Sequence, residues 1–95
     1  AQVFYYGQSE VGKELAETLQ ESLISLVDPD NHRQAKANES YYLLKKTTSP
    51  TVIVECGFLS NSEEAALLVT SDYQDTLVDA ICQGIFTYLE ANQYL

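Results

Sequence analysis

Basic residues are scarce in this sequence. Its 95 residues include five Lys or Arg and fourteen Asp or Glu, which gives a formal net charge of −9 at pH 7. A nucleic-acid backbone and an anionic membrane surface would both repel so acidic a chain. We therefore expect no nucleic-acid partner.

Long apolar runs are also missing. No run approaches the roughly 20 apolar residues that a membrane span requires, and no charged-then-apolar signal segment opens the sequence. With four Gly, two Pro and 45% hydrophobic residues, the composition is typical of a folded domain. We expect one domain over residues 1–95 and no membrane span.

Cysteine and histidine are too few for an ordinary zinc site. Cys56 and Cys82 form no Cys-x-x-Cys pair, and each lies in an apolar run, where a thiol commonly packs as a small hydrophobic group. We expect two buried thiols, and a disulfide between them stays open. The single histidine, His32, is expected on a loop surface, and we expect no metal site in this chain.

Charge is unevenly distributed along the chain. Residues 29–50 carry four basic and two acidic side chains, whereas residues 51–95 carry seven acids and no base. Arg33 and Lys36 belong to the basic segment. The simpler interpretation is a solvated loop, and the alternative is a shallow site that attracts the carboxylates of a ligand.

Hydrophobic patterns predict an α/β fold. We expect strands over 3–6, 41–44 and 51–55, a helix that follows Ser9 and ends before Pro29, a short helix after a capping box at 60–63, and a long last helix opened by 71–74. The continuous apolar character of 51–55 predicts a strand covered on both faces. Three strands make a thin sheet, so we expect strands that are missing or supplied by a partner.

Glu55 is the residue that most strongly suggests chemistry. It ends the apolar strand 51–55 and is followed by Cys56 and Gly57, with no other charge close in sequence. Burying an unpaired carboxylate is costly, so such a group usually has an ion-pair partner or a chemical role. Glu55 could act as a general acid/base, pair with Arg33 or Lys36, or reach solvent at the strand end.

One stretch of the sequence resembles a known motif. Residues 50–61, Pro-Thr-Val-Ile-Val-Glu-Cys-Gly-Phe-Leu-Ser-Asn, with Glu63-Glu64 and Leu67-Leu68 after them, resemble the closing motif of the zinc-dependent N-acetylmuramoyl-L-alanine amidases of the amidase-3 family. Residues 1–6, 33–36, 42–44 and 73–85 are similar to further segments of that family. Cys56 after the glutamate resembles members that act on spore peptidoglycan.

The resemblance implies a fold and a reaction. Members have a three-layer α/β/α fold and hydrolyse the amide between N-acetylmuramic acid and the L-alanine of the stem peptide. Two histidines and a glutamate hold their zinc, and a second glutamate in the closing motif is the catalytic acid/base. On this resemblance Glu55 accepts a proton from the attacking water and passes one to the departing amine.

The resemblance also predicts what this chain lacks. The family's zinc ligands precede the segment that 1–6 resembles, so we expect a C-terminal portion of about three strands and three helices, without those ligands and inactive alone. Peptidoglycan is the expected partner, with Arg33 and Lys36 near stem-peptide carboxylates, in a bacterial cell wall or spore envelope. Exposed strand edges predict self-association. The alternative function is a non-catalytic protein-interaction module on an amidase scaffold.

Overall fold

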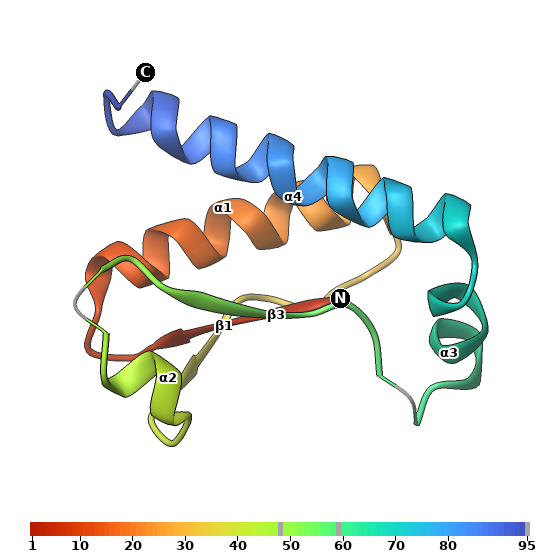
Figure 1. Ribbon diagram of the computed structural model, residues 1–95, viewed down its shortest axis with the longest axis horizontal. Coiled ribbons are helices and arrows are strands. Elements are labelled where there is room, and N and C mark those ends of the chain that lie inside the picture. The colour runs from red at the N-terminus through yellow and green to blue at the C-terminus, as the bar shows by residue number, and fades with distance from the viewer. Residues whose placement is uncertain (48, 59, 95) are drawn as a thin grey trace.

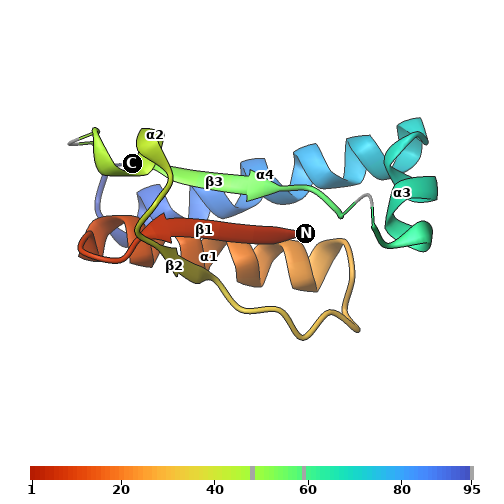
Figure 2. The same ribbon diagram turned by 90° about the horizontal axis from the view of Figure 1, so that it is seen from below.

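The computed structural model describes residues 1–47, 49–58 and 60–94 and contains one three-stranded mixed sheet with four helices. The elements are β1 (Gln2–Tyr6), α1 (Glu10–Leu26), β2 (Lys36–Asn38), α2 (Tyr42–Lys45), β3 (Val52–Glu55), α3 (Ser62–Leu68) and α4 (Ser71–Ala91). In the strand order β2-β1-β3, β1 runs parallel to β2 and antiparallel to β3 (Figure 2). The α/β prediction is confirmed.

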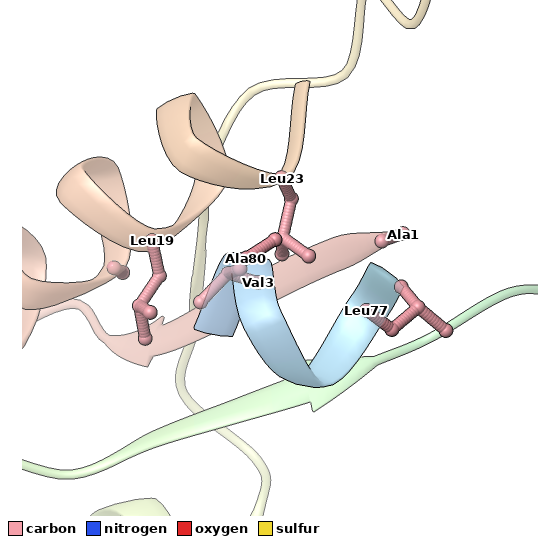
Figure 3. Close-up of a cluster of buried hydrophobic side chains, with 7 residues drawn as sticks. Ala1, Val3, Leu19, Leu23, Leu77 and Ala80 are labelled. Carbon is pink, nitrogen blue, oxygen red and sulfur yellow. The ribbon is translucent and has the colours of Figure 1, made fainter. Parts of the chain in front are cut away.

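Helices α1 and α4 lie side by side and cover one face of the sheet, while α2 lies on the other side (Figure 1). The core between sheet and helices is built from small and branched side chains (Figure 3). These are Ala1, Val3, Ala16, Leu19, Leu23, Leu77 and Ala80. Successive residues of a strand point to opposite faces. Val3 faces the helices, so its neighbour Phe4 lies on the other face of the sheet.

The prediction that the third strand is covered on both faces is wrong for the described residues. β3 lies at an edge of the sheet, and all four of its residues are partly exposed. Val52 and Val54 pack against the core, whereas the face that carries Ile53 and Glu55 is opposite to α1 and α4. Within the described part of the chain, the second helix layer of the expected three-layer fold is limited to the one-turn α2.

The predicted strand over 41–44 is also wrong, because this segment forms α2. The Asn38 side chain accepts hydrogen bonds from the backbone N–H groups of Ser40 and Tyr41, at 2.8 Å each, and so turns the chain into the helix. The second strand lies earlier, at Lys36–Asn38, and its first two side chains are exposed. A short, exposed edge strand has no hydrophobic alternation that could have predicted it.

The predicted helix ends are mostly correct. Ser9 caps α1 by accepting a 3.0 Å hydrogen bond from the backbone of Gly12, and α1 ends before Pro29. The capping residue of α3 is Asn61, one position later than predicted, and its side chain accepts from the backbone N–H groups of Glu63 and Glu64. The capping residue of α4 is Thr70, one position earlier than the predicted Ser71, and it makes no side-chain capping bond.

The expectation of two buried thiols is wrong for Cys82. Both cysteines are free thiols; Cys56 is half-buried and Cys82 is exposed. The α4 face that meets α1 is formed by Ala80 and Gly84, and a residue midway between them in sequence points away from that contact. No helix in the described ranges combines the length and apolar character needed to cross a membrane.

Candidate active site

Glu55 stands at the end of β3, half-buried, on the sheet face opposite to α1 and α4. The register aligns Ile53 with Phe4 and Phe4 with Lys36, so these three side chains share the face of Glu55. Glu55 and Lys36 lie on the two strands that flank β1, which places these strands about 10 Å apart. We call this surface the open face; Figure 2 views the molecule from this side.

Tyr41 at the start of α2 reaches over the open face. Its ring meets the ring of Phe4 edge-on, with 5.6 Å between the centroids. Its hydroxyl donates to Oε1 of Glu55 at 3.4 Å, a long and therefore weak hydrogen bond. Among the described residues, Glu55 makes no ion pair with Arg33 or Lys36. The pairing considered from the sequence is therefore not formed there.

The loop after Glu55 is held by Glu64 of α3. Oε2 of Glu64 accepts a 2.6 Å hydrogen bond from the backbone N–H of Phe58, and Oε1 accepts one from Nη1 of Arg33 at 2.5 Å. The Arg33 guanidinium also lies over the Phe58 ring, 4.3 Å from its centroid. Arg33 is therefore engaged by two partners. Leu59, the next residue of the motif, lies outside the described residues.

The pKa of Glu64 reflects these contacts. Burial of the carboxylate acts to raise the pKa, but the hydrogen bonds from Arg33 and Phe58 and the nearby guanidinium charge outweigh it and lower the pKa below its ordinary value. Glu64 is consequently a carboxylate near neutral pH, and it compensates the charge of Arg33.

An open hollow of about 720 Å³ lies beside the open face. Its wall includes Phe4, Lys36, Arg33 and Phe58 but not Glu55. The wall is of mixed charge, since Asp28, Asp30 and Glu64 also line it. The basic segment predicted from the sequence is thus interleaved with acids in space.

His32 is exposed at the wall of the hollow, in agreement with the loop-surface prediction. Within the part of the chain that the structure describes, no three His, Cys, Asp or Glu side chains are grouped so that they could hold a metal ion. The described residues therefore do not fit a zinc site on their own.

Of the site residues predicted from the sequence, Glu55 and Lys36 share the open face, and Arg33 lies at the loop after Glu55. The pairing of Arg33 with Glu64 was not predicted. The useful signal is the spacing Asn61-x-x-Glu64, which places Glu64 in the first turn of α3 with its side chain free to reach back toward the preceding loop. The position of Tyr41 beside Glu55 was not predicted either, because 41–44 was expected to be a strand.

Three comparisons show what this chain is similar to. The germination-specific N-acetylmuramoyl-L-alanine amidase of Bacillus subtilis (strain 168) is 38% identical over 88 residues, which are 93% of this chain and 37% of that protein. The CwlD amidase from Clostridioides difficile, solved in complex with the GerS lipoprotein, is 42% identical with a TM-score of 0.92; the match covers 95% of this chain and 46% of that one. An N-acetylmuramoyl-L-alanine amidase from Clostridium difficile 630 is 30% identical with a TM-score of 0.85, over 94% and 47% of the two chains.

The chain thus spans less than half the length of each of these proteins. Its fold nevertheless matches the corresponding part of both solved structures almost throughout. The model of one family, described as N-acetylmuramoyl-L-alanine amidase, matches residues 1–87. The chain therefore belongs to the amidase-3 family of N-acetylmuramoyl-L-alanine amidases.

Proposed function

We propose that this chain is the C-terminal part of an amidase domain and supplies its general acid/base, Glu55. The whole protein would hydrolyse the amide between N-acetylmuramic acid and the L-alanine of the stem peptide. The observation that carries this proposal is the position of Glu55, half-buried at a strand end on the open face of a chain of this family. There a substrate can approach from the side that α1 and α4 leave uncovered.

Glu55 would move protons in this reaction. Its carboxylate would accept a proton from the attacking water and deliver one to the nitrogen of the departing alanine. The Tyr41 hydroxyl, 3.4 Å from Oε1, would orient the carboxylate without neutralising it. Zinc, when bound, polarises the scissile carbonyl; because the described residues contain no three-ligand group, its ligands would come from outside them.

The open face also suggests how substrate is held. Lys36 shares this face with Glu55 and makes no ion pair among the described residues, so its ammonium is the stronger candidate for a stem-peptide carboxylate. A substrate contact by Arg33 stays a prediction, but its guanidinium is already engaged by Glu64 and Phe58. Peptidoglycan as substrate places the protein in a bacterial cell wall or spore envelope.

The test is Glu55→Gln in the whole protein that carries this chain. The amide keeps the shape of the side chain but cannot take up a proton, so we expect hydrolysis of a muramoyl-peptide to fall at least about a hundredfold. The measurement is the appearance of free L-alanine amine, with zinc content and melting temperature unchanged. Glu63→Gln, on the exposed side of α3, is the matched control.

Unchanged hydrolysis in the Glu55→Gln variant would contradict the proposal and favour the alternative, a non-catalytic interaction module on the same scaffold. An exposed apolar surface on α4 favours that alternative. Val78, Ile85 and Phe86 of α4 are 57%, 41% and 56% exposed and give the helix an apolar outer surface. A relative of this chain was solved in complex with a lipoprotein.

A further inference from the structure

We infer that Arg33 and Glu64 are positioning residues: together they fix the loop that follows Glu55, and thereby the place of the Glu55 carboxylate on the open face. This inference rests on the proposed function, because it concerns the same site. It assigns Arg33 a role through Glu64 and Phe58 rather than through substrate.

Both oxygens of Glu64 take part in the hold on this loop. Oε2 accepts from the backbone N–H of Phe58 at 2.6 Å, and Oε1 accepts from Arg33 at 2.5 Å. Hydrogen bonds to an ionised carboxylate are roughly twice as strong as those between neutral groups. The Glu64 side chain is only 13% exposed, which limits competition from water.

Phe58 is held at its ring as well as at its backbone. The Arg33 guanidinium lies 4.3 Å from the ring centroid, within the range of a cation–π contact. One arginine thus contacts both the ring of Phe58 and the carboxylate that binds the Phe58 backbone. Removing Arg33 would take the nearest cation from this largely buried carboxylate and leave it with the Phe58 N–H and the amino group of Ala1 at 4.0 Å, which is costly.

The groups that grip the loop are themselves anchored. Asn61 caps the first turn of α3, which carries Glu64. The backbone of Arg33 donates to Oδ1 of Asn31 at 2.9 Å. Gly57 lies so close to α3 that a Cβ added there would stand 3.1 Å from Cδ1 of Leu68. The described part of the loop, residues 56–58, is therefore in contact with α3 at Gly57 and at Phe58.

Glu55 depends on this hold because it lies between two constraints. On its N-terminal side, β3 pairs with β1 and the register sets Glu55 opposite Gln2. On its C-terminal side, two residues separate it from the held Phe58. β3 is an edge strand of four residues, and without the second constraint its last residue would fray.

The experiment is steady-state kinetics on the whole protein with a muramoyl-peptide as substrate, comparing Arg33→Met, Glu64→Gln and the double variant. Misplacement of a catalytic group lowers kcat, so each single variant is expected to lose at least about tenfold in kcat while KM stays the same. Because the two residues act together, the double variant is expected to lose no more than the worse single one. Lys13→Met, an exposed lysine on α1, is the control.

A rise in KM with unchanged kcat in Arg33→Met would overturn the inference, since it would show that Arg33 binds substrate. Losses that multiply in the double variant would overturn it equally. If Arg33→Met does not fold, Arg33→Lys takes its place, with the same expected split between kcat and KM and a smaller loss.

A failure of the proposed function can be told apart from a failure of this inference. If the wild-type protein does not hydrolyse the substrate, the proposed function fails. Amide hydrogen exchange at Phe58 then tests whether Glu64 still fixes the loop after Glu55. Faster exchange of the Phe58 amide in Glu64→Gln would support the inference that Glu64 fixes the loop, and an unchanged rate would overturn that inference.

Discussion

At the scale of single residues, the site depends on how two glutamates are surrounded. Glu55 was predictable, because a carboxylate that ends an apolar strand is visible in the sequence itself. Glu64 was not recognised as the partner of Arg33, because the two are 31 positions apart and only the fold brings them together. Isolation of a charge can be seen in a sequence, whereas compensation of a charge depends on tertiary contacts.

The ionisation of Glu64 gives a prediction about stability and pH. Its pKa in the folded protein is lowered below the ordinary 4.5, because the contacts with Arg33 and Phe58 outweigh burial. The unfolded chain therefore binds its proton at higher pH, and the stability from this group is complete above pH 4.5 and is lost as pH falls through the folded pKa. We expect thermal melts to show Glu64→Gln less stable than wild type at neutral pH, with the difference shrinking in acid. A gap that stays constant with pH would contradict this account.

At the scale of elements, the two long helices meet through small residues. Gly84 of α4 is buried against α1, where an added Cβ would lie 2.6 Å from Cδ2 of Leu19 and 3.3 Å from its Cα. Ser22 of α1 also donates a 2.6 Å hydrogen bond to the Ala80 carbonyl of α4. Hydrophobic periodicity predicted both helices, but it carries no signal for a contact made through small residues. Ile85 and Phe86, two large apolar residues of α4, are instead exposed.

Gly84→Leu tests this packing. Leucine favours helix more than glycine does, so a loss of stability can be assigned to overpacking, and we expect about 2 kcal/mol less free energy of unfolding. Urea denaturation measures the change. Cys82→Ala, at an exposed position of the same helix, should leave the midpoint nearly unaltered. A Gly84→Leu protein as stable as wild type would show that the helices separate more readily than the structure indicates.

The errors at this scale have a common physical cause. An apolar run of four residues fits a strand or a helical turn equally well, and side-chain hydrogen bonds from Asn38 decide for the turn in α2. Conversely, β2 forms by pairing with β1 and contributes little to the core. Where backbone pairing rather than burial creates an element, hydrophobic pattern carries no signal for it.

At the scale of the whole molecule, both outer strands of the sheet are edges among the described residues, and the open face is uncovered apart from α2. An apolar edge strand is a template for pairing with another chain. We therefore propose that the 95-residue chain, prepared alone, self-associates.

Sedimentation velocity tests this at several concentrations. We expect dimers or larger species, and Ile53→Lys should shift the chain toward monomer, because a charge on the open face of β3 opposes pairing without entering the core. A monodisperse monomer with a cooperative thermal transition would refute the proposed self-association.

The proposed role of Glu55 is amide hydrolysis at one bond of peptidoglycan. Mass spectrometry of a muramoyl-peptide treated with the whole protein tests it most directly, with wild type and Glu55→Gln in parallel. We expect wild type to add water only across the bond between the muramic lactyl group and L-alanine, and the variant to leave this bond intact. Cleavage at another bond, or equal cleavage by both proteins, would contradict it.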